Sequence, residues 1–209
     1  MIRIIHEIDD PTLMEQVWSF RHQRFVVERG WTELRRPDLR ERDEFDTNHA
    51  YHAVLIDGRD VVGYSRLLPT TLPHLTQEFA GRQGTTTPAG PSVFEWSRCA
   101  VAPGPRKIDG KLPSDILMTG VLECLIELEA TSVVFLTYNN VIKMMRRRGY
   151  PVVTLCSVAL QNGDSVNAAA SLLTKELLLQ HRQRHDISGS ILDWGRATDA
   201  KRLKPPAAA

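Results

Sequence analysis

Two β-rich segments separated by a short polar turn limit the folds open to this chain. Residues 51–56 and 61–68 are rich in apolar and β-branched side chains, and D-G-R-D lies between them at residues 57–60. Such a glycine-containing turn between two apolar runs predicts an antiparallel hairpin. The other apolar segments alternate between strand-like and helix-like patterns, so the hairpin must belong to a mixed sheet.

Helical patterns flank this hairpin on both sides. Asp10 followed by Pro11 predicts a helix start, and apolar positions at three- and four-residue steps continue to Phe25 before Gly30 ends the helix. Further helices are expected over residues 72–79, 139–148 and 175–185 and in a long segment capped by Ser114 and Asp115, and strands over residues 2–6, 93–101, 132–138, 150–156 and 166–173. This order predicts an α/β fold, a three-layer αβα sandwich around one twisted mixed sheet.

Length and composition favour one domain without a membrane segment. The 209 residues suffice for a single core, so we expect one domain over residues 1–198 and a disordered Pro/Ala-rich tail at 199–209. No apolar run reaches the roughly 20 residues of a membrane span, which favours a cytoplasmic protein. The net charge is +1, and we expect no nucleic-acid partner. Three widely spaced cysteines suggest neither a disulfide framework nor a zinc site, so no metal is expected.

The segment over residues 20–46 carries an unusual set of charged and aromatic side chains. F-R-H-Q-R-F-V-V-E-R-G-W runs from a helical pattern into a charged loop that ends in E-R-D-E-F-D. Loops with little periodicity commonly form binding segments. We therefore interpret Arg21, Phe25, Trp31, Asp43 and Asp46 as one wall of a site for a charged small molecule.

The predicted strand over residues 93–101 holds an acidic residue among apolar ones. Alternation places Glu95 and Ser97 on one face and Trp96 and Arg98 on the other. An unpaired glutamate in such a strand would cost several kcal/mol. Glu95 must therefore lie at an exposed edge, pair with an arginine, or act in function.

These motifs resemble, in order and spacing, those of the acyl-homoserine-lactone synthases, the LuxI-type autoinducer synthases. The resemblance rests on R-x-x-x-F with G-W (Arg21 to Trp31), D-E-F-D (from Asp43), R-L-L-P-T-T (from Arg66) and E-W-S-R (from Glu95). It covers about the first half of the chain. It implies a fold similar to the GNAT acetyltransferases.

The resemblance also implies an activity. The substrates would be S-adenosylmethionine, as the acyl acceptor, and an acyl thioester on coenzyme A or acyl carrier protein, with no further cofactor. The products would be N-acyl-L-homoserine lactone, methylthioadenosine and the free thiol, and a separate transcriptional regulator would detect the lactone in quorum sensing. The loop sequence is most similar to the branch that uses coenzyme A thioesters of branched or aryl acids, although acyl carrier protein stays open as the donor.

The resemblance assigns roles to nine residues. Glu95 would take the proton of the substrate amine, with its basicity raised by burial. Backbone N–H groups around residues 97–101 would stabilise the oxyanion. In the empty site, Arg21, Arg66 and Arg98 would pair with Asp43, Asp46 and Glu95. The catalytic candidates are Glu95, Asp43 and Arg98, and the substrate-binding candidates are Arg21, Phe25, Trp31, Asp46, Arg66 and Ser97.

Three alternatives stay open from the residues. The chain could be another GNAT-like N-acyltransferase acting on a different amine, although A-P-G-P-R-K-I-D-G fits a coenzyme A pyrophosphate loop poorly. It could be a non-catalytic ligand-binding relative. The charged residues could also be an ion-pair network that only fixes the loop.

A basic cluster at Lys143, Arg146, Arg147 and Arg148 suits a carrier protein or coenzyme A phosphates, and equally a solvated helix end.

Overall fold

The fold is that of a computed structural model, which describes residues 1–161 and 163–195. The predicted tail at residues 199–209 and the last residues of the predicted domain lie outside this part. Within it, no helix is long and apolar enough to cross a membrane.

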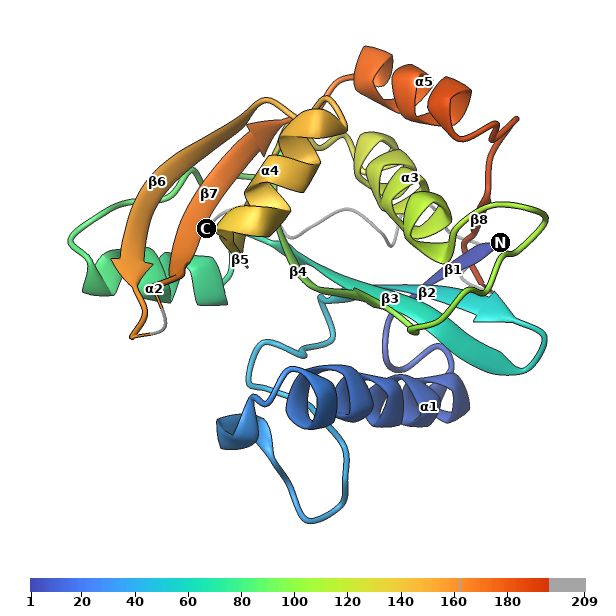
Figure 1. Ribbon diagram of the computed structural model, residues 1–209, viewed down its shortest axis with the longest axis horizontal. Coiled ribbons are helices and arrows are strands. Elements are labelled where there is room, and N and C mark those ends of the chain that lie inside the picture. The colour runs from blue at the N-terminus through green and yellow to red at the C-terminus, as the bar shows by residue number, and fades with distance from the viewer. Residues whose placement is uncertain (162, 196–209) are drawn as a thin grey trace.

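One sheet of eight strands forms the centre of the molecule (Figure 1). The strands are β1 (Ile2–Ile5), β2 (Tyr51–Asp57), β3 (Asp60–Pro69), β4 (Val93–Val101), β5 (Ser132–Tyr138), β6 (Val152–Ala159), β7 (Ser165–Leu172) and β8 (Leu192–Asp193). Their order is β6-β7-β5-β4-β3-β2-β1-β8, with parallel pairing of β4 with β5 and of β1 with β8 and antiparallel pairing elsewhere. The predicted hairpin of β2 and β3 is confirmed, whereas the short strand β8 was not predicted.

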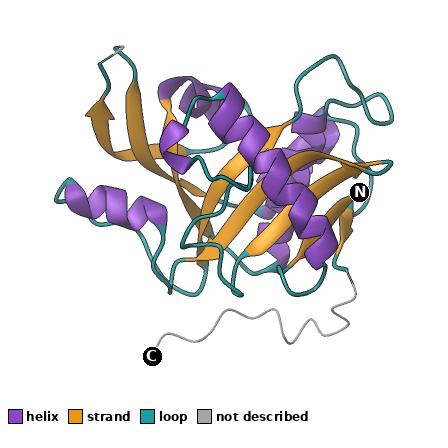
Figure 2. Cartoon of the chain, turned by 90° about the horizontal axis from the view of Figure 1, so that it is seen from below, coloured by secondary structure: helices purple, strands orange, loops and turns teal. Residues whose placement is uncertain are grey.

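Helices cover both faces of the sheet, as the αβα prediction requires (Figures 1 and 2). The helical segments are α1 (Pro11–Arg21), the π-helical η1 (His22–Glu28), the 3₁₀ turn η2 (Thr32–Leu34), α2 (Leu75–Arg82), α3 (Pro113–Glu127), α4 (Asn139–Arg147) and α5 (Lys175–Arg184). The helices α1 and α2 lie on one face, and α3, α4 and α5 lie on the other.

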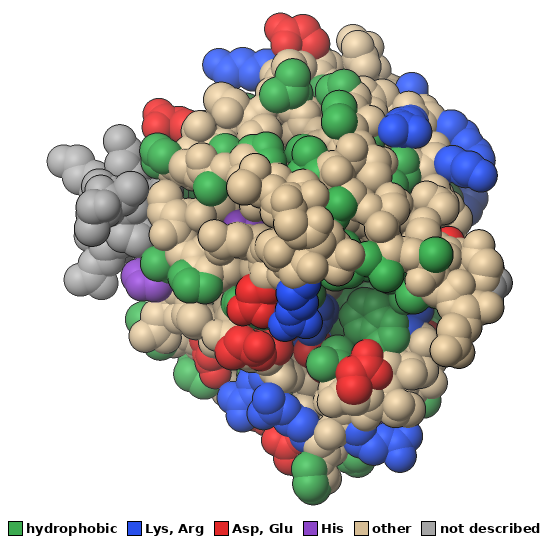
Figure 3. All heavy atoms as spheres, turned by 90° about the vertical axis from the view of Figure 1, so that its left-hand side faces the viewer, with side chains coloured by type: hydrophobic (Ala, Val, Ile, Leu, Met, Phe, Trp, Pro, Cys, Tyr) green, Lys and Arg blue, Asp and Glu red, His purple; other side chains and the backbone are tan. Residues whose placement is uncertain are grey.

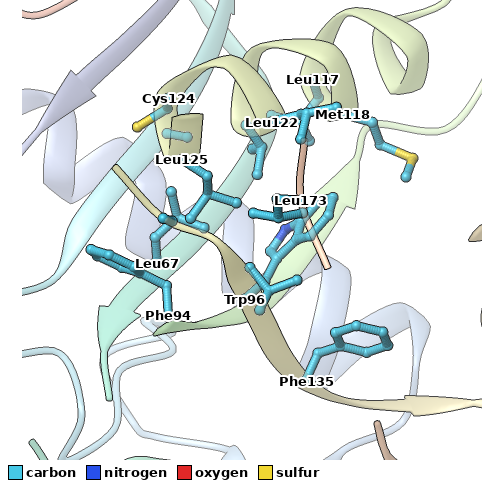
Figure 4. Close-up of a cluster of buried hydrophobic side chains, with 14 of the residues drawn as sticks. Leu67, Phe94, Trp96, Leu117, Met118, Leu122, Cys124, Leu125, Phe135 and Leu173 are labelled. Atoms are coloured by element: carbon cyan, nitrogen blue, oxygen red, sulfur yellow. The ribbon is translucent and has the colours of Figure 1, made fainter. Parts of the chain in front are cut away.

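The main core lies between the sheet and α3. Leu67, Phe94 and Trp96 of the sheet pack with Leu117 and Leu122 of α3, and all five are at most 6% exposed (Figure 4). A smaller cluster under α1 contains apolar residues of α1, β1, β2 and β3. The two clusters fix the sheet between its helical layers, since burial of apolar surface is the main favourable term in folding.

Two helix starts differ from the predictions. Asp10 caps α1 as expected, because its Oδ1 accepts a hydrogen bond from the Leu13 N–H at 2.9 Å. The long helix α3 begins at Pro113 with Leu112 as its N-cap, so the predicted capping by Ser114 and Asp115 is wrong. The helix predicted over residues 72–79 begins three residues later, after His74.

A β-bulge in β4 reverses the expected direction of one arginine. Arg66 of β3 pairs with Ser97 of β4, and Tyr64 pairs with Ala100. One residue therefore lies between the paired positions on β3, whereas two, Arg98 and Cys99, lie between them on β4. Arg98 has a φ of 54°, which breaks the alternation of the strand. The prediction that Arg98 shares a face with Trp96 is therefore wrong, and Arg98 points to the α1 side of the sheet.

The parallel contact between β4 and β5 is short. It joins Val93 to Ser132, Phe94 to Val133 and Glu95 to Val134, and β5 continues alongside β7 up to Tyr138. From Trp96 onward, β4 follows β3 instead. The two central strands therefore diverge directly after Glu95.

Candidate active site

Six charged side chains form a closed ring in which basic and acidic groups alternate. Each arginine bridges two carboxylates, and each carboxylate bridges two arginines. In order around the ring they are Arg21, Glu41, Arg98, Asp43, Arg66 and Asp46, which we call the charge ring. The sequence predicted five of its members and missed Glu41.

The contacts of the charge ring are short. Arg21 donates from Nε to Glu41 Oε2 at 2.6 Å and from a terminal nitrogen to Asp46 Oδ1 at 2.8 Å. Arg98 donates to both oxygens of Glu41 at 3.2 Å and to Asp43 Oδ2 at 2.7 Å. Arg66 completes the ring at Asp43 and, at 2.9 Å, at Asp46. Because three positive and three negative groups meet, the ring is electrically balanced.

The acidic loop holds its carboxylates in place through its own backbone. The N–H of Asp43 donates to Asp46 Oδ2 at 2.9 Å, and the N–H of Phe45 donates to Asp43 Oδ1 at 3.0 Å. The ring of Phe45 is buried against Ala50 and Leu68. This aromatic anchor and the two turns explain why D-E-F-D brings both aspartates to the same side.

Burial and ion pairing act in opposite directions on the carboxylates. Burial alone would raise the pKa of Asp46, but Arg21 and Arg66 outweigh it and hold this pKa far below its ordinary range. Burial opposes ionisation of Glu41 in the same way, and Arg21 and Arg98 keep its pKa below the usual value. All three arginines have side chains at most 6% exposed, so the ring is charged although it is buried.

A neutral histidine lies beneath the charge ring and was not predicted as part of the site. Nδ1 of His52 is 2.7 Å from the Tyr64 hydroxyl, and Arg21 donates to the same hydroxyl at 3.4 Å. Burial lowers the pKa of His52 to about 3, and the attraction of Asp46 does not restore it against Arg21 and Arg66. The Tyr64 hydroxyl therefore shares a hydrogen bond with a neutral imidazole.

This histidine makes stability depend on pH. An unfolded histidine titrates near pKa 6.5, so between about pH 6.5 and pH 3 the unfolded chain binds a proton that the folded chain does not. Stability should fall as pH decreases through this window, by up to about 1.4 kcal/mol per pH unit from His52 alone. Urea unfolding of the wild type and of His52→Asn should show a shallower decrease in the variant.

The exposed His49 supplies the control for this experiment. His49→Asn should keep the wild-type slope. Buried His181, whose pKa is lowered to about 4, contributes equally to all three proteins. Parallel decreases in the wild type and His52→Asn would contradict a neutral buried His52.

An aromatic pair covers one side of the charge ring. Phe25 and Trp31 stack with their ring centres 5.1 Å apart and their planes 15° apart. The guanidinium of Arg98 lies 5.8 Å and 5.6 Å from these two rings. Phe25 lies in the π-helical segment η1. The backbone N–H of Trp31 donates to the backbone carbonyl of Phe25 at 3.0 Å, which brings the two aromatic residues together.

Glu95 lies outside the ring and does not pair with an arginine as expected. Its Oε2 accepts from the N–H and the hydroxyl of Thr76 at 2.6 and 2.8 Å, and it lies 3.1 Å from Nδ1 of His74. Burial opposes ionisation, but the His74 contact, the charge of Arg66 and the Thr76 N–H together lower the pKa of Glu95. The expectation that burial raises its basicity is therefore wrong.

Ser97 lies two residues after Glu95 on β4 and contacts the charge ring. Its hydroxyl accepts from Nε of Arg66 at 3.1 Å. Eight of the nine predicted site residues are thus joined to one another by hydrogen bonds, ion pairs or ring contacts, and Glu95 lies two residues from Ser97 on the same strand. Figure 3 shows a hollow lined by hydrophobic side chains beside a group of acidic and basic ones.

A separate groove of about 690 Å³ lies between α1, the start of β3 and the loop after β4. Phe20, Arg24, Arg40 and Arg106 are among its lining residues. None of the nine predicted site residues lines it.

Comparison with known proteins finds a matching family model and similar solved structures. Residues 20–112 match the family model of the acetyltransferase (GNAT) domain. A coenzyme A-dependent acyl-homoserine lactone synthase, BjaI, solved with S-adenosylmethionine and isopentyl-CoA, superposes with a TM-score of 0.83 at 27% identity, covering 97% of this chain and 98% of that one. A second such synthase, MesI, superposes with a TM-score of 0.82 at 29% identity over 93% of this chain and all of its own. The fold is that of a GNAT-type acyltransferase.

Curated proteins of similar sequence identify the family. An acyl-homoserine-lactone synthase of Pseudomonas aeruginosa is 31% identical over 66% of this chain and 68% of its own length. An isovaleryl-homoserine lactone synthase of Bradyrhizobium diazoefficiens is 42% identical over 90 residues, a match that spans 41% of this chain and 40% of that relative. The chain belongs to the acyl-homoserine-lactone synthase family.

Proposed function

We propose that this synthase transfers the acyl group of a coenzyme A thioester of a branched or aryl acid to S-adenosylmethionine and then closes the lactone ring. The likeness to BjaI and MesI, both described as coenzyme A-dependent, supports this donor over acyl carrier protein. The local identity to an isovaleryl-homoserine lactone synthase supports a branched acid. The products are N-acyl-L-homoserine lactone, methylthioadenosine and coenzyme A, all formed in the cytoplasm, and a separate regulator detects the lactone.

A binding site for the acyl acceptor needs both positively and negatively charged groups. S-adenosylmethionine carries a carboxylate, an ammonium and a sulfonium. The charge ring offers guanidinium groups for the first and carboxylates for the others, and Phe25 with Trp31 offers flat faces for adenine or the sulfonium. The single observation that carries the proposal is this balanced ring beside an aromatic pair and a buried, separately held Glu95.

Acyl transfer begins with loss of a proton from the substrate ammonium. In our proposal Glu95 takes this proton, directly or through a water, since its Oε1 is buried and has no partner among the described residues. The amine then attacks the thioester carbonyl carbon, the C–S bond breaks with its electron pair on sulfur, and the thiolate takes up the surplus proton of the new amide nitrogen to leave as the thiol. The bulge at Arg98 supports a role for backbone N–H groups as oxyanion donors, because a bulged residue leaves the hydrogen-bond ladder.

Lactone formation follows within the acylated substrate. Its carboxylate oxygen attacks the carbon bonded to sulfur, and methylthioadenosine leaves with the electron pair of the C–S bond. The protein has only to hold the chain curled, because a near-attack geometry lowers the barrier by several kcal/mol. Arg21, Arg66 and Arg98 are the groups we assign to holding that carboxylate.

A donor panel tests the proposal. Purified protein incubated with S-adenosylmethionine and matched acyl groups on coenzyme A or on acyl carrier protein should release methylthioadenosine, measured by mass spectrometry. We expect at least a tenfold higher kcat/KM with isovaleryl- or aryl-CoA than with the same acid on the carrier protein, a difference of about 1.4 kcal/mol. Faster turnover with the carrier protein would contradict the donor, and acylation of a different amine would contradict the acceptor.

A further inference from the structure

The two carboxylate oxygens of Glu95 have unequal surroundings. Oε2 accepts from the Thr76 N–H, the Thr76 hydroxyl and His74 Nδ1, whereas Oε1 is buried and has no partner among the described residues. A buried carboxylate oxygen without a donor is unfavourable. The carboxylate is thus held by one oxygen, and the other is left for a proton or a hydrogen-bond donor.

His74 can form this contact in only one neutral tautomer. Its Nδ1 lies 3.1 Å from Glu95 Oε2 and 3.3 Å from the backbone N–H of Gln77, and one ring nitrogen cannot donate to the first and accept from the second. The low pKa of Glu95 keeps the carboxylate ionised, so the shorter contact requires a proton on Nδ1. His74 is fully buried, and its Nε2 has no partner among the described residues.

We propose that His74 is a positioning residue for acyl transfer: its Nδ1–H, together with the two donors of Thr76, fixes Oε2 of Glu95 so that Oε1 alone takes up the substrate proton. This inference rests on the proposed function, because it concerns the base of that reaction. It goes beyond the predicted site, since His74 follows R-L-L-P-T-T-L-P without any pattern that marks it as functional.

The groups that act on Glu95 come from two elements. Arg66 of β3 contributes charge, and His74 with Thr76, at the start of α2, contributes hydrogen bonds. All of them favour the ionised carboxylate. Removal of the His74 donor should therefore make Glu95 easier to protonate and leave Oε2 held by the two Thr76 donors alone.

Two substitutions of His74 separate positioning from a structural role. Asparagine places an N–H donor near the position of Nδ1 and remains a good helix cap, whereas leucine removes the donor. For His74→Leu we expect a maximal kcat about tenfold lower than that of the wild type. We also expect the acid limb of its kcat–pH profile to move up by about one pH unit. Both changes have the size expected for loss of a hydrogen bond to a charged group. His74→Asn should stay within about twofold of the wild type in both.

A role of His74 limited to capping α2 predicts a different result. If His74 only caps α2, His74→Leu lowers the melting temperature while the acid limb stays in place, and the inference is wrong. Should His74→Leu fail to fold, Thr76→Val, which removes one of the same three donors without changing side-chain shape, must move the acid limb in the same direction.

Titration of Glu95 in the free enzyme requires no turnover, so it tests the role of His74 separately from the proposed function. Carbon-13 NMR of protein labelled at glutamate carboxyl groups follows the titration of Glu95 directly, with Glu95→Gln identifying its signal. The Glu95 titration should move to higher pH in His74→Leu and stay in place in His74→Asn. If the wild type forms no methylthioadenosine, the proposed function fails, whereas an unchanged Glu95 titration in His74→Leu overturns the positioning role alone.

Discussion

Glu95→Gln should lower kcat by about 10²- to 10⁴-fold, the usual contribution of a general base, while the Kd for S-adenosylmethionine stays within about threefold. The amide oxygen of glutamine can take the place of Oε2 and accept from Thr76 and His74, so the local fold is kept. The amide nitrogen then occupies the place of Oε1 and cannot accept a proton. Rapid-quench measurement of methylthioadenosine and calorimetric titration of S-adenosylmethionine give the two quantities.

Glu44→Gln is the matched control, because Glu44 is exposed on the acidic loop. It should leave kcat and binding unchanged. A comparable loss of turnover and binding in Glu95→Gln would mean that Glu95 has a structural role, and an unchanged kcat would remove it from the mechanism.

Glu41→Gln should lower the free energy of unfolding by about 3–5 kcal/mol, the range measured when one partner of a buried ion pair is removed. Glu41 is fully buried between Arg21 and Arg98, and its loss leaves the ring with three positive and two negative groups. Asp46 and Asp43 each already bridge two arginines and cannot compensate fully. Urea unfolding at pH 7 measures the effect as a lower midpoint.

Glu33→Gln tests whether the effect belongs to the ring. Glu33 is exposed in η2, which precedes this loop, so its substitution should change stability by less than about 0.5 kcal/mol. If the two variants unfold at the same urea concentration, the charge ring does not hold this loop. A loss for Glu41→Gln that disappears in 1 M salt would show instead that the ring is open to solvent, since buried pairs are screened much less.

The strands were predictable because their signal is local. Runs of apolar and β-branched residues bounded by turns gave β2, β3 and β4 almost to the residue. The direction of Arg98 was not predictable, because the bulge depends on the pairing of β4 with β3 and leaves no mark in V-F-E-W-S-R-C-A-V. One inserted residue was enough to move Arg98 to the opposite face.

The charge ring was predictable in part for a similar reason. Arg21 interrupts an apolar helical stripe and Asp43 and Asp46 flank Phe45, and such departures from pattern are visible in a sequence. Glu41 lies among several loop charges, and only the tertiary structure distinguishes it from exposed neighbours. His74 belongs to the same category, because its partner is 21 residues away on another element.

The ionisation of Glu95 depends on its hydrogen-bond donors as well as on its burial. An acidic residue in an apolar strand suggests desolvation and hence a raised pKa. Desolvation is indeed the largest influence, but His74, Arg66 and Thr76 together reverse its sign. A sequence that does not reveal which donors surround a carboxylate cannot give the direction of its pKa shift.

The short parallel contact between β4 and β5 divides the sheet into two parts. Every member of the charge ring and the aromatic pair lies between residues 21 and 98, within the first part of the chain, whereas β5, β6, β7, α4 and α5 all follow residue 131. Only three residue pairs join the two halves of the sheet at their junction. If the charge ring binds S-adenosylmethionine as we propose, substitutions in the later half should change which acids are accepted and leave the affinity for S-adenosylmethionine unchanged.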